Sequence, residues 1–231
     1  MNGASRIFNQ INPKKVKLLG DSITHGVGGT GFKQNGEPIV TEFKRNPDGF
    51  CWAKMFSELL SDKYSATVTN NACTGTTIEF IIEHFDNLVD STDELAICTI
   101  GTNNRHQYMN TGAKRDRDEM YSDFCKKIDE LYLKFKEKGI PAVFMANIPA
   151  SEKNEQDTDT YWRILHMNDI NDAYTAAAKK HGFPFISLYE LFSGYCKENE
   201  ISLNSLLIDG LHPNDEGYKV MFSLITRALG V

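Results

Sequence analysis

Two short segments near opposite ends of the sequence carry the residue types of serine-dependent acyl transfer. Gly20-Asp21-Ser22 follows an apolar run, and a serine at such a turn can present its hydroxyl to a substrate. Asp209 and His212 lie close together near the other end of the chain. Acyl transfer through a serine needs a histidine to take the hydroxyl proton and a carboxylate to orient that histidine. Each segment alone is also typical of a turn, because Gly, Asp and Ser are common turn formers.

Two further segments contain hydrogen-bond donors of the kind that stabilise a developing oxyanion. Gly75 lies within residues 71–77, and Asn103 lies in Gly101-Thr102-Asn103-Asn104. The N–H of a glycine, the amide of an asparagine and the N–H of the serine itself would together supply the donors. Separately, each segment is also compatible with ordinary turn chemistry. The four segments together indicate a catalytic site.

The elements that must position these residues follow from the apolar pattern. Short apolar runs predict strands at residues 16–20, 66–70, 95–100, 142–148 and 184–188. Longer segments with helical spacing alternate with them, at residues 50–60, 78–89, 117–138, 162–180 and after Pro213. This alternation is typical of a parallel sheet with helices on both faces, in which ligands bind at the carboxyl ends of the strands. We therefore expect the four segments to meet at one edge of the sheet.

In this order along the chain, the four segments resemble the sequence blocks of the SGNH hydrolases, also called the GDSL esterase/lipase family. Residues 20–22 match the first block, Gly75 the second, residues 101–104 the third and residues 209–214 the fifth. The matches extend over nearly the whole chain. The resemblance implies the α/β class: a three-layer α/β/α sandwich of the flavodoxin-like SGNH hydrolase fold with a parallel sheet of about five strands. We expect one such domain over residues 1–231.

The same resemblance implies a role for each matched residue. Ser22 would be the nucleophile, His212 the general base and then acid, and Asp209 the residue that orients His212. Gly75 and Asn103 would form the oxyanion hole together with the backbone N–H of Ser22. This mechanism requires no cofactor and no metal.

Four further residues are candidates to line the substrate site: Asp21, His25, Trp52 and Asn104. The third block commonly reads aspartate where this chain has Asn104, so we expect a changed hydrogen bond or substrate contact there. His25 is equally consistent with a solvated turn residue, and Trp52 with a core residue at helical spacing.

Two polar stretches, residues 26–48 and 150–161, fit no regular element and are candidate substrate loops. Tyr161-Trp162-Arg163, at the end of the second stretch, could also meet substrate. The polar character of both stretches argues against a long-chain lipid substrate.

Charge and composition exclude other classes of protein. The chain has 25 Lys and Arg against 31 Asp and Glu, and this net charge of −6 argues against nucleic-acid binding. The N-terminal segment lacks the apolar run of a signal peptide, and no apolar run is long enough for a membrane span, so we expect a cytoplasmic protein. The five cysteines are widely spaced, which favours free thiols over a zinc site.

The sequence therefore predicts a serine esterase that hydrolyses small acyl esters, such as acetyl esters of a carbohydrate or another polar alcohol. Three alternatives stay open: an acyltransferase to a sugar hydroxyl with the same triad, a lipase- or lysophospholipase-type acylhydrolase, and a non-catalytic carbohydrate-binding module. The only partner predicted is the small-molecule or carbohydrate ester itself. The oligomeric state is not predicted.

Overall fold

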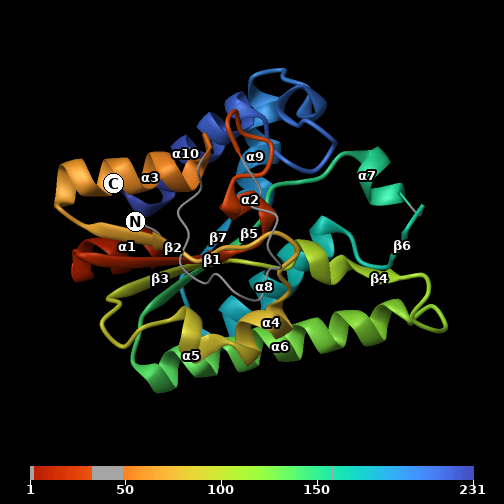
Figure 1. The fold of residues 1–231 in the computed structure, drawn as a ribbon, viewed down its shortest axis with the longest axis horizontal. Helices are drawn as coiled ribbons and strands as arrows, with labels where there is room; N and C mark the ends of the chain where they lie inside the picture. Colours follow the sequence, from red (N-terminus) through yellow and green to blue (C-terminus); the bar gives the residue numbers. More distant parts are fainter. Residues whose placement is uncertain (1–2, 33–48, 158) are drawn as a thin grey trace.

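The computed structural model of the chain describes residues 3–32, 49–157 and 159–231. A parallel five-stranded sheet forms its centre (Figure 1). In spatial order its strands are β2 (Thr67–Asn70), β1 (Lys15–Gly20), β3 (Leu95–Thr99), β5 (Ala142–Ala146) and β7 (Phe185–Ser187). This is the strand order of flavodoxin-like folds. The predicted three-layer α/β/α sandwich is confirmed.

The central strands form where the sequence is continuously apolar. Every residue of β3 and of β5 is buried. A parallel strand with helices on both faces must be apolar on both sides, so it is a continuous apolar run and does not alternate with polar residues. All five strands lie within two residues of the positions predicted from the sequence.

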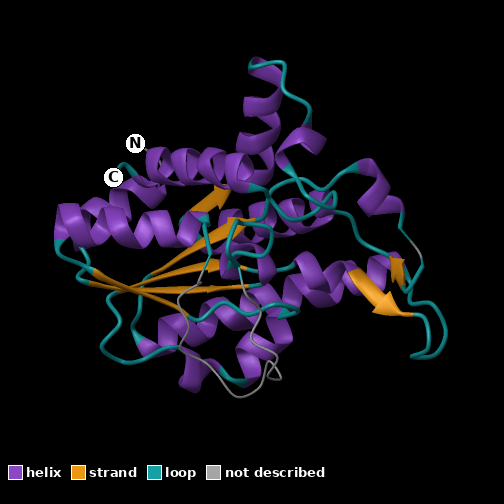
Figure 2. Cartoon of the chain, turned by 45° about the horizontal axis from the view of Figure 1, so that its top comes forward, coloured by secondary structure: helices purple, strands orange, loops and turns teal. Residues whose placement is uncertain are grey.

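Helices cover both faces of the sheet (Figure 2). One face packs against α1 (Gly3–Ile11), α3 (Trp52–Tyr64), α9 (Leu188–Glu198) and α10 (Asp215–Leu229). The other face packs against α4 (Ile78–Glu83), α5 (Phe85–Leu88), α6 (Arg117–Lys138) and α8 (Met167–His181). Successive residues of β1 point to opposite faces of the sheet. Leu18 packs in the apolar cluster on the first face, and Leu19 packs in the cluster on the other face. None of the described helices has both the length and the apolar character that crossing a bilayer requires.

Several elements differ from the sequence prediction. The helix expected at 78–89 is two short helices, α4 and α5, which meet at His84. The helix expected at 162–180 begins only at Met167, because residues 161–163 form a strand. Helices α1 and α9 were not predicted, whereas α6 has the predicted bounds.

A small lobe projects beyond the carboxyl ends of the strands, at the right of Figure 1. It contains an antiparallel ribbon of β4 (His106–Tyr108) and β6 (Tyr161–Arg163), with the short helix α7 (Glu152–Gln156). The chain reaches β4 from β3 through a 3₁₀ helix, η1 (Thr102–Arg105). A second 3₁₀ helix, η2 (Leu203–Leu206), precedes α10. Of the first predicted substrate loop, residues 33–48 lie outside the described residues.

Candidate active site

The segment that we call the serine turn, residues 20–26, leads from β1 into the short helix α2 (Ser22–His25). Asp21 caps this helix, and its Oδ1 accepts the N–H of Ile23 at 3.1 Å. Gly20 allows the tight turn, because a Cβ at this position would lie 2.8 Å from the carbonyl oxygen of Thr99. These contacts place Ser22 at the carboxyl end of β1, where the residue is 4% exposed.

Helix α10 holds the serine turn from the other side. The hydroxyl of Tyr218, a fully buried residue of α10, donates to the carbonyl oxygens of Ile23 at 3.0 Å and Val27 at 2.7 Å. Tyr218 therefore fixes the distance between the serine turn and the helix that follows the predicted base.

The second segment, which we call the histidine loop, covers residues 207–214. A β-bridge between Leu207 and Pro213 closes its base. Asp209 Oδ1 accepts the backbone N–H of Leu211 at 3.0 Å and of His212 at 2.8 Å, which folds the loop into a tight turn. Asp209 therefore organises the backbone of the loop as well as facing its histidine.

Helix α7 supports the histidine loop at Gly210. The carbonyl oxygen of Gly210 accepts the N–H of Ser151 at 2.7 Å. Gly210 has φ +84°, and a Cβ there would lie 2.2 Å from Ser151 Oγ. Only glycine fits this position without strain, because both the backbone conformation and the space exclude a side chain.

The two segments meet through a continuous chain of hydrogen bonds. The hydroxyl of Ser22 lies 2.8 Å from His212 Nε2, and His212 Nδ1 lies 2.7 Å from Asp209 Oδ2. Burial raises the pKa of Asp209, but the hydrogen bonds from the ring and backbone of His212 outweigh it and lower that pKa to about 2. Asp209 is therefore ionised at neutral pH and accepts the Nδ1–H of His212, which leaves Nε2 free to accept the serine proton.

The predicted oxyanion donors lie beside the serine turn. The N–H of Cys73 donates to the carbonyl oxygen of Gly20 at 3.1 Å, which holds the loop containing Gly75 against that turn. Asn103 donates one amide hydrogen to the carbonyl oxygen of Thr76 at 2.8 Å, and the second remains available. In the described part of the chain, no acceptor takes the backbone N–H of Ser22 or Gly75. These donors are free to meet an oxyanion.

A buried polar cluster lies beneath this site. Asn147, at the end of β5, donates to Asp21 Oδ2 at 2.9 Å and to Thr102 Oγ1 at 2.6 Å. Burial raises the pKa of Asp21, which has no exposed surface. Asp21 was predicted to line the substrate site, and the structure places it in the interior as a hydrogen-bond acceptor. Sequence reasoning missed Asn147, although its position after an apolar strand matches those of Ser22 and Asn103.

Two other predicted lining residues are also buried. Trp52, in the first turn of α3, has no exposed surface and packs against Phe56 in the core. His25 is 5% exposed, with Nδ1 at 3.2 Å from the hydroxyl of Thr74 and its ring edge against Phe32. Trp52 is therefore a core residue. His25 is neither a lining residue of the described cavity nor the solvated residue of the alternative reading.

Asn104 joins two elements at the side of the site. Its Oδ1 accepts the N–H of Ile78 at 3.0 Å, and its Nδ2 donates to Glu79 Oε2 at 2.7 Å. A carboxylate could not donate the second bond. Asn104 therefore ties η1 to α4 and is not among the residues that line the cavity.

A cavity of about 520 Å³ opens beside the predicted oxyanion donors, between the histidine loop and the β4–β6 ribbon. Its walls include Gly75, Asn103, Leu211 and residues of both ribbon strands. Of the predicted substrate contacts Tyr161-Trp162-Arg163, Tyr161 and Arg163 line it, whereas Trp162 between them packs against the core. Sequence reasoning did not find the partners on β4, His106 and Tyr108. A three-residue strand is too short to show a period.

A buried arginine connects η1 to α7, the helix that contacts the histidine loop. Arg105 has no exposed surface. It donates to the carbonyl oxygen of Thr102 at 3.0 Å, to Glu155 at 2.8 Å and to Asn154 at 3.2 Å. Burial lowers its pKa to about 10, which keeps it charged at neutral pH. Arg105 thus ties η1, which carries Asn103, to α7.

Comparisons with known proteins agree on one group. The sequence profile of the GDSL-like Lipase/Acylhydrolase family matches residues 18–220. No curated protein sequence matches the chain significantly. A catalytic mutant of an acetylxylan esterase from Geobacillus stearothermophilus has a similar structure, with a TM-score of 0.70 and 18% identity over 94% of both chains. An alpha/beta hydrolase enzyme from the metagenome of Lake Arreo, Spain, has a TM-score of 0.68 and 20% identity, over 94% of this chain and 95% of the other. At these identities the likeness establishes the fold.

Proposed function

The chain belongs to the GDSL-like Lipase/Acylhydrolase family, and from this premise we propose that it is a serine esterase that removes acetyl groups from a carbohydrate. Family membership makes the chain a carboxylic ester hydrolase. The observation that carries the finer proposal is the hydrogen-bond chain from Ser22 through His212 to Asp209, beside a cavity lined by Gly75 and Asn103.

Acylation begins when Ser22 Oγ attacks the ester carbonyl carbon and passes its proton to His212 Nε2. The carbonyl oxygen becomes an oxyanion and accepts hydrogen bonds from the backbone N–H of Ser22 and Gly75 and from the amide of Asn103. Asp209 stabilises the imidazolium. His212 then donates the proton to the departing alcohol, and the acyl group stays on Ser22.

Deacylation repeats these steps with water. His212 takes a proton from the water molecule, the hydroxide attacks the acyl carbon, and the same donors hold the second oxyanion. Collapse of this intermediate returns the proton to Ser22 Oγ and releases the acid.

One observation supports an acetylated sugar as the substrate, and a second supports the proposed catalytic roles of Asp209 and His212. The cavity wall is rich in tyrosine, histidine, arginine, glutamine and threonine, which suit a hydroxyl-rich ring better than a long acyl chain. In the Geobacillus acetylxylan esterase, catalytic mutants replace a serine, an aspartate and a histidine by alanine. The aspartate and histidine changed there are three positions apart, as Asp209 and His212 are here.

The test is hydrolysis of a p-nitrophenyl ester series, acetyl through dodecanoyl, by the wild type and by Ser22→Ala. We expect the acetyl ester to have the highest kcat/KM and Ser22→Ala to lower kcat by at least about 10⁴-fold. Ser223→Ala, on the exposed side of α10, is the matched control and should keep full activity. Wild-type rates in a folded Ser22→Ala protein would refute the serine mechanism. A maximum at long acyl chains would refute only the proposed acyl length.

A further inference from the structure

Arg163 is a cation in the cavity wall that the fold does not neutralise. It lies half-buried on β6. Its Nη1 lies 2.9 Å from His106 Nδ1, and its Nε donates to the carbonyl oxygen of Asn154 at 3.3 Å. Both partners are uncharged acceptors. Within residues 3–32, 49–157 and 159–231, no carboxylate forms an ion pair with Arg163.

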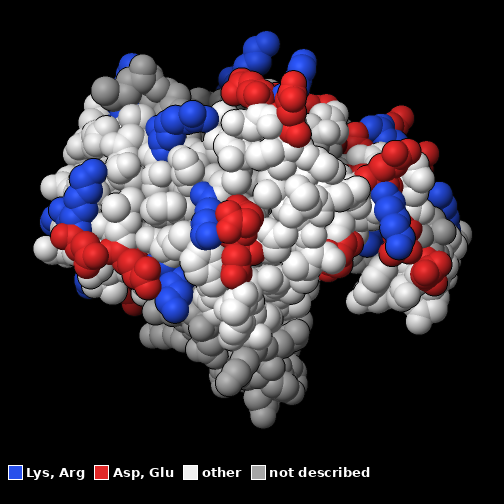
Figure 3. All heavy atoms as spheres, turned by 90° about the horizontal axis from the view of Figure 1, so that it is seen from above, with Lys and Arg blue, Asp and Glu red and all other residues white. Residues whose placement is uncertain are grey.

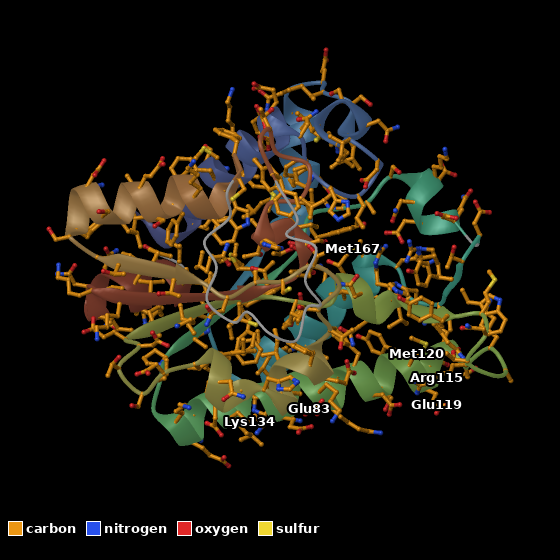
Figure 4. The ribbon with its side chains drawn as sticks, viewed as in Figure 1. Glu83, Arg115, Glu119, Met120, Lys134 and Met167 are labelled. Atoms are coloured by element: carbon orange, nitrogen blue, oxygen red, sulfur yellow. The ribbon has the colours of Figure 1, made fainter. Side chains whose placement is uncertain are left out.

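The other two arginines that line the cavity form ion pairs with carboxylates that do not line it. Arg105 pairs with Glu155 at 2.8 Å. Arg115 pairs with Asp123 at 2.5 Å and with Glu119 at 3.3 Å. Figure 4 shows Arg115 and Glu119 together at the start of α6, with Met120 of the cavity wall beside them. The charge of Arg163 is therefore the one that a bound ligand would meet.

The chain as a whole makes this charge unusual. Its net charge is −6, and yet no Asp or Glu is among the described residues that line the cavity. On the face seen in Figure 3, acidic and basic side chains are intermixed at the end of the molecule that carries the small lobe, at the right of the view. An uncompensated arginine inside the cavity contrasts with the paired charges on that face.

His106 holds Arg163 without adding a second charge. Burial, with the nearby charges of Arg163 and Arg105, lowers the pKa of His106 to about 4. At neutral pH His106 is therefore uncharged, and its Nδ1 accepts the hydrogen bond from Arg163. The guanidinium is oriented by neutral groups, and Nη2 has no acceptor in the described part of the chain.

Two tyrosines form an aromatic wall next to Arg163. The rings of Tyr108 and Tyr161 lie 4.6 Å apart between centroids, and their hydroxyls are 3.3 Å apart. Tyr108 is 52% exposed, although it is a large aromatic residue. Tyrosine offers an apolar face together with a polar hydroxyl, which suits a ring that is apolar on its C–H face and polar at its edge.

We propose that this cavity binds a sugar that carries a carboxylate, so that the natural substrate is an acetylated uronic acid residue. The carboxylate binds the exposed end of the Arg163 guanidinium, whose planar fork matches a carboxylate. The sugar ring lies against Tyr108 and Tyr161, and the acetyl carbonyl reaches the donors at Gly75 and Asn103, which line the same cavity. This inference rests on the proposed esterase function and specifies the substrate class of the same site.

The test compares two substrates that differ only at one carbon: acetylated methyl glucuronide and acetylated methyl glucoside. For the wild type we expect kcat/KM to be at least about 10-fold higher for the glucuronide, the size expected of one hydrogen bond to a charged group. Arg163→Gln should remove most of this preference. Arg163→Lys, which keeps the charge but loses the fork, should retain part of it. Arg227→Gln is the matched control, in the last turn of α10 at the opposite end of the molecule (Figure 1), and should leave the preference unchanged.

The outcomes separate this inference from the proposed function. A wild type that hydrolyses p-nitrophenyl acetate but cleaves both sugar acetates equally well contradicts the carboxylate site alone. An equal loss on both sugars in folded Arg163→Gln also contradicts it, because the residue would then be structural. If no ester is hydrolysed, the proposed function fails. NMR titration of methyl glucuronide into the wild type and Arg163→Gln then decides the binding question, with weaker binding to the variant expected and equal binding contradicting the site.

Discussion

The serine turn and the histidine loop meet at one site, but the fold holds them in opposite ways. The serine turn is supported by the interior: Asp21 and Tyr218 have no exposed surface, and Ser22 begins a short helix one residue after β1. The histidine loop lies at the surface, with the side chain of Asp209 49% exposed, and it rests on the short helix α7 outside the sheet. The core therefore fixes the proposed nucleophile, and a peripheral contact fixes the proposed base.

The two carboxylates of these segments show the same difference. Burial raises the pKa of Asp21, where it acts as a hydrogen-bond acceptor for Ile23 and Asn147. The pKa of Asp209 is lowered to about 2 by its bonds to His212, despite an opposing effect of burial. One residue type is a structural acceptor in the interior and an orienting charge at the surface.

The largest effect on activity is expected from removing the charge of Asp209 in the histidine loop. In Asp209→Asn, the carbonyl oxygen can still accept the backbone N–H groups, but the amide faces His212 Nδ1 as a donor. His212 would then carry its proton on Nε2 and could not accept one from Ser22, so we expect kcat for p-nitrophenyl acetate to fall by about 10³ to 10⁴-fold. Asp118→Asn, at an exposed position of α6, is the control. A loss below about 10-fold would show that Asp209 does not orient the base.

A smaller effect is expected where α7 supports the loop. Gly210→Ala places a Cβ against Ser151 in a left-handed backbone conformation, so we expect the free energy of unfolding to fall by about 1 to 3 kcal/mol. We also expect kcat to decrease, because the loop that carries His212 must shift. Urea unfolding and ester hydrolysis measure the two effects. The double variant Ser151→Gly/Gly210→Ala relieves the clash but not the backbone strain, and it should recover only part of the loss. An unchanged free energy of unfolding in Gly210→Ala would contradict the claim that the contact with Ser151 supports the histidine loop.

The smallest effect is a difference in pH dependence between the two carboxylates. For Asp209, the folded pKa of about 2 lies below the ordinary 3.8, so its stabilisation is present above about pH 4 and is lost as the pH falls toward 2. For Asp21 the folded pKa lies above 3.8, so its protonation stabilises the fold as the pH falls toward that value. Urea unfolding between neutral pH and pH 2 should therefore show the difference between wild type and Asp209→Asn shrinking. The difference between wild type and Asp21→Asn should grow toward pH 4. Parallel curves would mean that the two environments do not differ.

The sequence predicted the elements and segments whose signal is local. Strands β3 and β5 are apolar runs because they are buried on both faces. Ser22 lies two residues after the end of β1, and Asn103 lies four residues after the end of β3. Helix α6 ends at Gly139, which adopts the left-handed conformation expected of a terminating glycine. These features depend on neighbouring residues alone and can be read without the fold.

The remaining features depend on contacts between distant segments. Arg105 looks like any charged residue in the sequence, and only the fold brings Glu155 to it, 50 positions away. Trp52 and His25 were both predicted to line the site, but both residues are buried in the fold. Strands β4 and β6 have three residues each, so their pairing leaves no periodic pattern. The cavity wall was therefore the part of the site that sequence reasoning described least.

Residues 149–166 contribute both to the cavity and to the support of the histidine loop, which limits how they can be engineered. This segment places Tyr161 and Arg163 in the cavity wall, and it also supports Gly210 through Ser151. A redesign of this segment for a new substrate would disturb turnover as well as selectivity. Strand β4 shares the cavity but makes no hydrogen bond to residues 207–214 within the described chain. Libraries randomised at His106 and Tyr108 can therefore change which ester is accepted while the histidine loop keeps its contact with Ser151.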